Sequence, residues 1–209
     1  MEKSVYSIIL SDRVVAEIDK VAYSQNMSRS SMINAILADY VSYRTPEKRS
    51  TEIFDVLERL LSGGVFRTSL DRSDFSMSFS APLAYKYRPT VKYSIELKRD
   101  PYPAVATLRV SVRSQSSALL REILTFFKAW QLAEQSEWWV EDGKYIKTLK
   151  TRDGVRLNEE QLGNELAAYV SALDRAMKIY FEYAGTPDAL RAVQRAYIEG
   201  IEETNCCII

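Results

Sequence analysis

The chain has 209 residues, 28 basic and 28 acidic side chains, no histidine and two cysteines, so its formal net charge is zero. The absence of histidine excludes histidine bases, catalytic triads and metal ligands, and two adjacent cysteines, Cys206 and Cys207, favour neither a disulfide framework nor a zinc site. The hydrophobic fraction of 46% is typical of a soluble globular protein, and no apolar run reaches the roughly 18 residues of a transmembrane helix, so we expect a cytoplasmic protein without membrane contact.

The first 43 residues predict one short strand followed by two helices. Residues 5–10 are apolar and strand-like, and helical runs follow at residues 14–22 and 32–41, separated by a break at residues 25–27. One strand and two helices are too few to close a hydrophobic core, and a lone strand needs another strand to pair with. This order of elements therefore predicts a dimer in which the strands of two copies pair.

The next part of the chain changes from a helix to strands. Residues 44–50 are a charged linker, and Thr51 is a candidate N-cap of a helix that stops at Gly63 and Gly64. Apolar and polar residues then alternate in three stretches, residues 75–80, 91–98 and 108–113. Alternation with a period of two predicts an antiparallel sheet with one buried face.

The remainder is predicted to be mostly helical. A helix runs from Ser117 through Trp130, and residues 145–149 form a short strand. Asn158 is a candidate N-cap of a long helix that ends before Gly185. In the sequence Gly185-Thr186-Pro187, the proline is expected at the first position of the last helix, at about residues 188–199.

These elements predict an α+β protein of two domains. Residues 1–45 form the N-terminal dimerisation unit. Residues 51–209 form a domain with an antiparallel sheet and several helices, whose role is sensing a ligand, binding a partner or extending the oligomer.

The N-terminal unit resembles a known family of DNA-binding proteins. The residues that carry the resemblance are the strand that ends at Leu10, the Ser11-Asp12 helix start, the apolar positions Val14, Val15, Ile18, Val21 and Ala22, and the second helix start from Met27 to Ile33. Over residues of about 3–43 the chain is similar to the ribbon-helix-helix fold of CopG- and Arc-type repressors. The resemblance implies that two copies pair their strands as an antiparallel ribbon, which enters the major groove of double-stranded DNA.

The resemblance and the alternation of the strand together give candidate DNA-binding residues. Tyr6, Ile8 and Leu10 are expected to face the helices, so that the other set faces DNA. The N-terminus of the second helix suits a backbone phosphate. The candidate DNA-binding residues are Lys3, Val5, Ser7, Ile9, Ser28, Arg29 and Ser30.

Two features depart from the family pattern. The outward positions of the strand are usually polar or basic, whereas Val5 and Ile9 can only touch thymine methyl groups. Residues 1–50 also carry a net charge of only +1, whereas residues 65–116 carry +5. The sequence therefore supports a ribbon-helix-helix fold more strongly than it supports base recognition.

The polar side of the predicted sheet gives a second candidate site, for an anionic ligand or a nucleic acid. Its residues are Lys92, Lys98, Arg109 and Arg113. The alternative is a solvated sheet face whose basic residues protect the edges. Trp138 and Trp139 either both pack in the core at a bend, or one of them lines a pocket or an interface.

No catalytic arrangement stands out. The chain has neither a glycine-rich phosphate loop nor a Gly-x-Ser-x-Gly motif, and Glu159 and Glu160 sit where they would interact with a helix dipole. We therefore expect no enzymatic activity, no catalytic residues, no cofactor and no metal site.

These expectations favour a cytoplasmic, repressor-type transcriptional regulator of prokaryotic type. It would bind a pseudo-palindromic operator in double-stranded DNA as a homodimer or a tetramer. The alternative is a structural or interaction protein, in which the first unit only dimerises and the C-terminal domain recruits a partner. A third possibility is an antitoxin whose C-terminal part binds a toxin.

Overall fold

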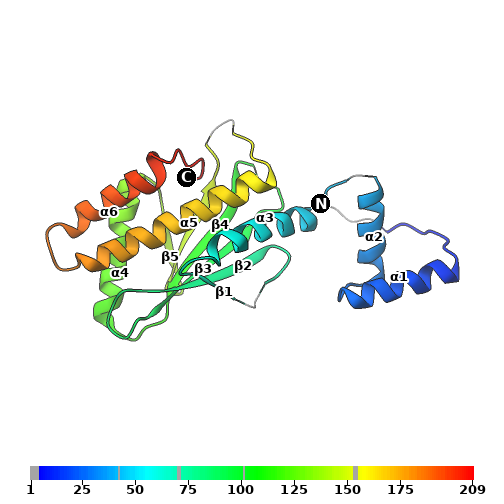
Figure 1. Cartoon of the computed structure of the whole chain (residues 1–209), viewed down its shortest axis with the longest axis horizontal. Helices are drawn as coiled ribbons and strands as arrows, with labels where there is room; N and C mark the ends of the chain where they lie inside the picture. The colour runs from blue at the N-terminus through cyan, green and yellow to red at the C-terminus, as the bar shows by residue number, and fades with distance from the viewer. Residues whose placement is uncertain (1–4, 42, 70–71, 101, 153–154) are drawn as a thin grey trace. The chain divides into compact units, whose positions relative to one another are not determined.

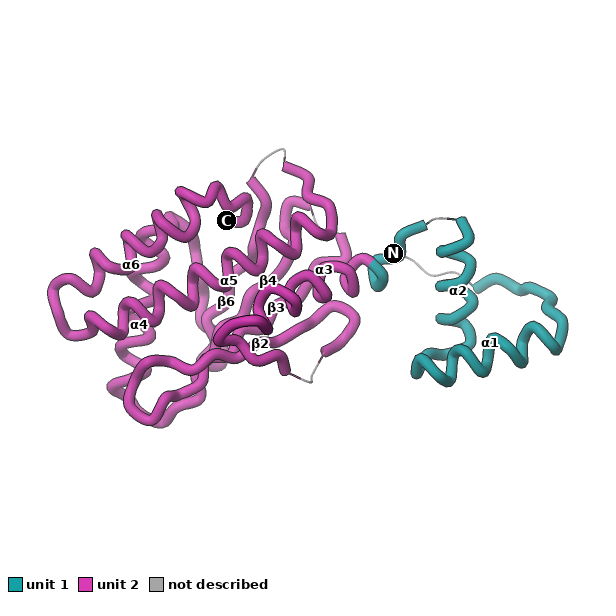
Figure 2. The backbone as a smooth tube through the Cα atoms, viewed as in Figure 1, with its two compact units in different colours: residues 1–48 teal, residues 49–209 magenta. Residues whose placement is uncertain are grey.

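The structure, a computed structural model, describes residues 5–41, 43–69, 72–100, 102–152 and 155–209 (Figure 1). The chain divides into two units, residues 1–48 and residues 49–209, here called unit 1 and unit 2 (Figure 2). Within the described ranges, none of the helices combines the length and the apolar character needed to cross a bilayer.

Unit 1 is built on two helices, α1 (Asp12–Ser24) and α2 (Arg29–Tyr40). Each begins at a serine N-cap: Ser11 accepts a hydrogen bond from the backbone of Val14, and Ser28 accepts one from the backbone of Ser31. The two helices therefore begin where the sequence predicts.

The strand predicted at residues 5–10 is not formed in the single chain, where these residues have no regular secondary structure. A strand is held by hydrogen bonds to a neighbouring strand, and among the described residues nothing pairs with this segment. The ribbon-helix-helix arrangement is therefore not confirmed by the structure of one chain.

The third helix starts earlier than the sequence predicts. Helix α3 (Pro46–Leu61) covers most of the predicted linker, and Thr51 lies inside the helix rather than at its N-cap. Thr45 provides the cap instead, since its Oγ1 accepts a hydrogen bond from the backbone N–H of Lys48 at 3.2 Å. Proline at the first position of a helix removes no intrahelical hydrogen bond, so Pro46 starts α3 rather than excluding a helix.

Unit 2 contains the predicted antiparallel sheet. Its six strands lie in the order β1-β2-β3-β4-β6-β5, and each pairs antiparallel with its neighbours. The strands are β1 (Arg67–Thr68), β2 (Ser76–Pro82), β3 (Thr90–Leu97), β4 (Ala104–Val112), β5 (Trp139–Glu141) and β6 (Lys144–Lys150). The four predicted strands correspond to β2, β3, β4 and β6. Asp142 and Gly143 both have positive φ angles, as a two-residue turn between β5 and β6 requires.

The helices of unit 2 cover one face of the sheet. Helices α3, α4 (Ser117–Glu134) and α5 (Glu159–Glu182) pack against it, as the arrangement in Figure 1 shows. Tyr93 of β3 donates a hydrogen bond to Asp174 of α5 at 2.9 Å, and Phe127 of α4 stacks on Tyr145 of β6. Helix α6 (Ala189–Tyr197) lies beside α4 and α5 and continues as a π-helix, Ile198–Glu202.

Two helix starts in unit 2 test the capping predictions. Asn158 caps α5 through a complete capping box with Gln161, as predicted. The last helix begins at Ala189, so Pro187 precedes its N-cap residue, Asp188, and is not the first helical residue. Asp188 makes no side-chain capping bond, so α6 begins without the N-cap hydrogen bond found at the starts of α4 and α5.

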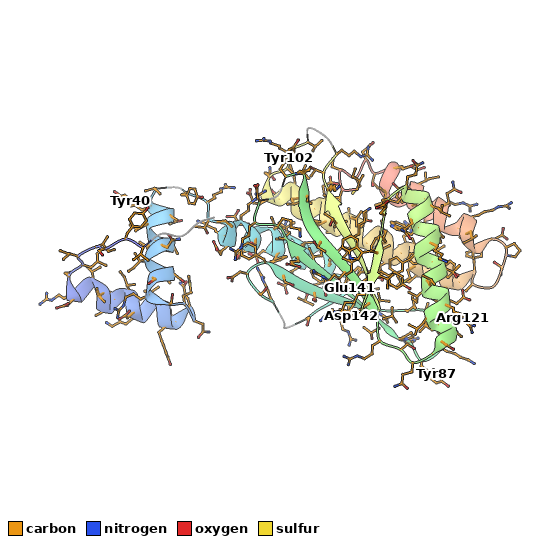
Figure 3. The ribbon with its side chains drawn as sticks, turned by 180° about the vertical axis from the view of Figure 1, so that it is seen from behind. Tyr40, Tyr87, Tyr102, Arg121, Glu141 and Asp142 are labelled. Atoms are coloured by element: carbon orange, nitrogen blue, oxygen red, sulfur yellow. The ribbon has the colours of Figure 1, made fainter. Side chains whose placement is uncertain are left out.

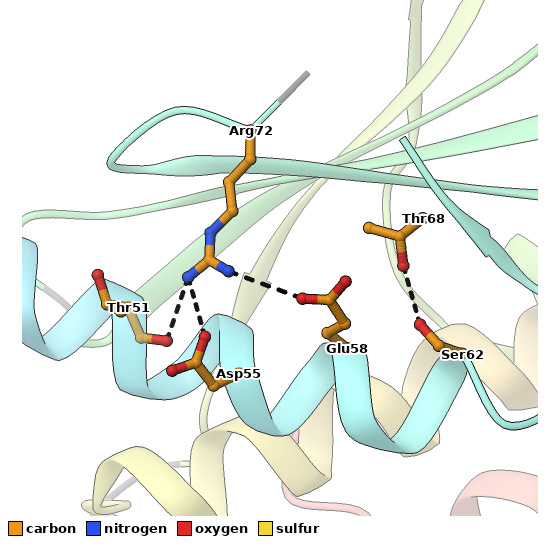
Figure 4. Close-up of polar contacts among 6 residues, drawn as sticks. All are labelled: Thr51, Asp55, Glu58, Ser62, Thr68 and Arg72. Carbon is orange, nitrogen blue, oxygen red and sulfur yellow. Dashed lines mark hydrogen bonds and ion pairs between the residues drawn. The ribbon is translucent and has the colours of Figure 1, made fainter. Parts of the chain in front are cut away.

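Polar contacts join the loop before β2 and strand β1 to α3 (Figure 4). Arg72 bonds to Asp55 at 3.1 Å and approaches Glu58 at 3.8 Å, and its guanidinium lies over the ring of Phe54. Ser62 and Thr68 share a hydrogen bond of 2.9 Å. These contacts place Thr68, and with it the inner side of β1, against the helices.

Candidate nucleic-acid interface

Unit 1 leaves most of its apolar side chains in contact with solvent. Among its described residues, the buried apolar ones are Ala22, Met32 and Ala38. Val5 and Ile9, by contrast, have exposed fractions of 97% and 102%. Such extended apolar exposure is unusual on a protein that acts as a monomer.

Exposure within residues 5–10 follows the predicted alternation in part. Ile8 and Leu10 are 58% and 38% exposed, less than Val5 and Ile9. Tyr6, which was also expected to face the helices, is 84% exposed. Ser7 is exposed, and Lys3 lies outside the described residues.

The start of α2 brings together the other candidate DNA-binding residues. The Ser28 side chain is engaged as the N-cap, and Ser30 is exposed on the first turn. Arg29 makes two hydrogen bonds to Asp19 of α1, with Nε at 2.7 Å from Oδ1 and Nη2 at 2.6 Å from Oδ2. The hydrogen bond from Arg29 also lowers the pKa of Asp19. A phosphate at this helix start would compete with Asp19 for the Arg29 guanidinium.

In unit 2, helices α3, α4 and α5 lie on one face of the sheet, and the opposite face, against which none of the described helices packs, is here called the open face. Side chains alternate along each strand, and on β3 the buried set is Val91, Tyr93, Ile95 and Leu97. The alternate residues of β3 and their register partners form the open face. It holds the hydrogen-bonded pair Ser78 and Ser94, at 2.9 Å, and the ion pair of Arg109 and Glu96, at 2.6 Å.

The four basic residues predicted to form an anion surface do not all come together. Lys92 and Arg109 lie on the open face of adjacent strands, since Lys92 pairs with Ser111 in the register. Lys98 directly follows β3, and Arg113 directly follows β4. Because β3 and β4 run antiparallel, Lys98 and Arg113 lie at opposite ends of this pair of strands. The predicted surface is therefore divided.

The register also brings together residues that the sequence analysis missed. Arg67 of β1 and Lys144 of β6 lie in the same row across the sheet as Lys92. A serine of the intervening strand is the register partner of both Arg67 and Lys92, and another is the register partner of both Lys92 and Lys144. The alternation within one strand shows which side a residue faces, but not which residue of a distant strand lies beside it. Only the pairing of all strands reveals this row.

A cluster of buried polar side chains between α4, α5 and β6 was also missed. Glu134 Oε1 accepts hydrogen bonds from Tyr169 at 2.5 Å and lies 2.6 Å from Lys147 Nζ, while Oε2 accepts from Ser136 at 2.5 Å and Trp138 at 3.2 Å. The side chains of Glu134 and Lys147 are 1% and 3% exposed. Burial lowers the pKa of Lys147, against the opposing effect of Glu134. The carboxylate has four partners and almost no solvent contact, so this cluster is suited to holding the helices on the sheet.

The adjacent tryptophans separate into two environments. Trp138 is 8% exposed and packs in the core, whereas Trp139 is 46% exposed on the open face of β5. The interpretation in which both pack in the core is therefore wrong. Glu141 and Asp142, labelled in Figure 3, lie at the turned end of the β5–β6 hairpin. Across the described residues, no group of three or more cysteine or acidic side chains is arranged to hold a metal ion.

Comparison of the chain with known protein families, with curated proteins and with solved structures found no match.

Proposed function

We propose that the chain is a repressor-type regulator that binds double-stranded DNA as a homodimer, with residues 5–10 of two copies paired as a ribbon. The observation that carries this proposal is the almost complete exposure of Val5 and Ile9 in a segment whose composition is that of a strand. A second copy supplies the missing strand, as in the ribbon-helix-helix family that this segment resembles. A two-fold dimer then matches a pseudo-palindromic operator.

The helices of unit 1 also expose apolar side chains that the pairing of two copies would bury. Val14 and Val21 of α1 and Ile36 and Leu37 of α2 are 48%, 42%, 46% and 55% exposed. Because these side chains are already about half buried, completing the burial of each between two copies contributes about 0.7–1.5 kcal/mol, which is half of the value for a fully exposed side chain. The ribbon and the helices together favour a dimer over an isolated unit 1.

DNA contacts would come from the outward side of the ribbon and from the start of α2. Ser7 can hydrogen-bond a base edge, while Val5 and Ile9 can pack only against thymine methyl groups. The exposed first turn of α2 at Ser30 suits a backbone phosphate. The proposal gives the chain a binding role and no catalytic step.

One observation favours a second function, in which unit 1 only dimerises and unit 2 recruits a partner. Residues 5–48 carry five basic and five acidic side chains, so this region has little attraction for a polyanion. Arg29 is also engaged by Asp19. Under this alternative the dimer forms but does not select DNA sequences.

A single experiment separates the two functions. The full chain is incubated at moderate salt with a pool of random duplexes, and the bound DNA is sequenced. A regulator enriches one pseudo-palindromic motif, and Ser7→Ala weakens binding to it about tenfold, as expected for one lost base contact. Ser24→Ala, which removes an exposed hydroxyl at the end of α1, is the matched control and leaves binding unchanged.

Sedimentation of the same samples decides between the outcomes. A dimer that enriches no motif rejects the regulator and supports the dimerisation function. A chain that sediments as a monomer in the presence and absence of DNA rejects both.

A further inference from the structure

The open face carries a row of basic residues that crosses nearly the whole sheet. The register pairs Arg67 with Ser80, Ser80 with Lys92, Lys92 with Ser111, and Ser111 with Lys144. The row, here called the cationic row, thus runs through Arg67, Ser80, Lys92, Ser111 and Lys144. It ends at Glu141 of the edge strand β5, which pairs with Lys144.

The three cations of this row are available to a ligand. Arg67, Lys92 and Lys144 are all exposed, and among the described residues no carboxylate lies within ion-pair distance of any of them. The nearby Arg109 differs, because Glu96 neutralises it at 2.6 Å. The cationic row therefore attracts anions without first having to break an internal pair.

The spacing of the row favours an extended anion over a compact one. Neighbouring strands are about 4.8 Å apart, so cations on every second strand are about 10 Å apart and the row spans about 20 Å. A single phosphate would contact one cation, whereas a polyanion lying across the strands would contact all three. Ser111 offers a hydroxyl donor between Lys92 and Lys144, whereas the Ser80 hydroxyl already donates to the Arg67 carbonyl at 3.4 Å.

An exposed aromatic ring lies beside the row. Trp139 is 46% exposed and is two residues from Glu141 on the same side of β5. Its register partner on the same face, Ile146, is only 3% exposed. An acidic peptide or an inorganic polyphosphate makes no particular use of such a ring, but an unpaired nucleic-acid base stacks on it.

The geometry points to a second nucleic-acid site: the open face binds a single-stranded nucleic acid, with phosphates along the cationic row and a base on Trp139. The face is a broad sheet, on which splayed bases can lie flat, whereas a rigid duplex would touch it along a narrow strip. All the residues of this site belong to unit 2. Duplex binding by unit 1 and single-strand binding by unit 2 can therefore succeed or fail independently.

Fluorescence anisotropy of the full chain with a labelled 12-nucleotide oligothymidylate, over a range of salt concentrations, tests this site. In the triple variant Arg67→Ala, Lys92→Ala and Lys144→Ala, the slope of log affinity against log salt falls by about 2, as expected for three lost phosphate contacts on a single strand. Trp139→Ala weakens binding about tenfold through loss of stacking.

A second triple variant controls for total charge. Arg121→Ala, Lys128→Ala and Arg195→Ala remove the same charge from exposed positions on α4 and α6, and Arg121 is labelled in Figure 3. This control is expected to bind the oligonucleotide with nearly the affinity of the wild type. Circular dichroism checks that each variant is folded.

Three results would overturn the inference. The first is the absence of binding by the wild type at 50 mM salt. The second is an equal loss of affinity in both triple variants, which would mean that only the net charge matters. The third is binding of a 12-base-pair duplex as tight as that of the single strand, with no effect of Trp139→Ala, which would identify a general polyanion surface.

Discussion

Two segments near opposite ends of the chain show how differently the two units are stabilised. At the end of unit 2, Ile208 is 0% exposed, and Ile209 exchanges two backbone hydrogen bonds of 2.9 Å with Lys150, the last residue of β6. In unit 1, Val5 and Ile9 are 97% and 102% exposed in a segment without regular structure. Both segments are rich in β-branched residues, but only the segment in unit 2 finds a partner within its own chain.

The same difference extends to the two cores. Unit 2 fully buries large side chains such as Phe54, Tyr93 and Trp130 between its sheet and its helices. In unit 1, the buried apolar side chains among the described residues are two alanines and one methionine, and no buried aromatic side chain accompanies them. We therefore expect unit 2 to be stable alone and unit 1 to need additional apolar contacts.

Separating the units should give the largest effect. A fragment of residues 44–209 is expected to unfold cooperatively at a temperature independent of its concentration. A fragment of residues 1–45 is expected to lose its helical circular dichroism on dilution, since its folding depends on association. The measurement is circular dichroism over a hundredfold range of concentration, combined with sedimentation. A helical, monomeric 1–45 fragment would show that unit 1 is complete by itself.

Local patterns were sufficient to predict most of unit 2. The alternation around Tyr93 and Val110 gave strands of an antiparallel sheet. The predicted helix start at Ser117 and the predicted N-cap at Asn158 are both confirmed by capping hydrogen bonds in the structure. The helix at Pro46 was predicted too short, because Thr51 was taken as its N-cap and Thr45 was not recognised as the cap. Periodicity and capping act within a few residues, so the sequence carries their signals directly.

Contacts between distant residues could not be predicted in the same way. The cationic row depends on the register of five strands, and Lys147 lies on the buried side of β6, where a lysine contradicts the usual pattern. Its partner Glu134 is 13 residues earlier at the end of a different element. For unit 1, the missing information is of another kind, because the partner proposed for residues 5–10 belongs to a second copy.

The second prediction compares the buried ion pair of unit 2 with the exposed ion pair of unit 1. Lys147→Met should lower the free energy of unfolding by about 3 kcal/mol, because it leaves the Glu134 carboxylate buried without its cation. The melting temperature of a unit of this size should fall by about 6–12 °C. Thermal melts followed by circular dichroism measure this change.

Two control variants show whether the effect of Lys147→Met comes from its buried ion pair. Lys128→Met, at an exposed position of α4, should leave the melting temperature of unit 2 almost unchanged. Arg29→Met removes the exposed pair with Asp19 and should produce no resolvable change, since solvent screens both groups. A loss for Lys147→Met no larger than that for Lys128→Met would show that the cluster around Glu134 does not hold unit 2 together.

The smallest expected effect is a difference in reactivity between the two cysteines of the C-terminal segment, residues 206–209, which is hydrogen-bonded to residues 150–152. Cys206 is 3% exposed, and burial raises the pKa of its thiol to about 12, whereas Cys207 is partly exposed. Only the thiolate reacts with iodoacetamide, so at pH 8 Cys207 should be alkylated first and Cys206 only slowly. Mass spectrometry of the single-cysteine variants Cys206→Ser and Cys207→Ser measures the two rates separately.

Ile208→Asp, which places a charge at a 0% exposed position, should release the segment and raise the rate of alkylation at Cys206. Equal rates for the two cysteines in the wild type would show that this end of the chain is as open in solution as residues 5–10 are in the single chain.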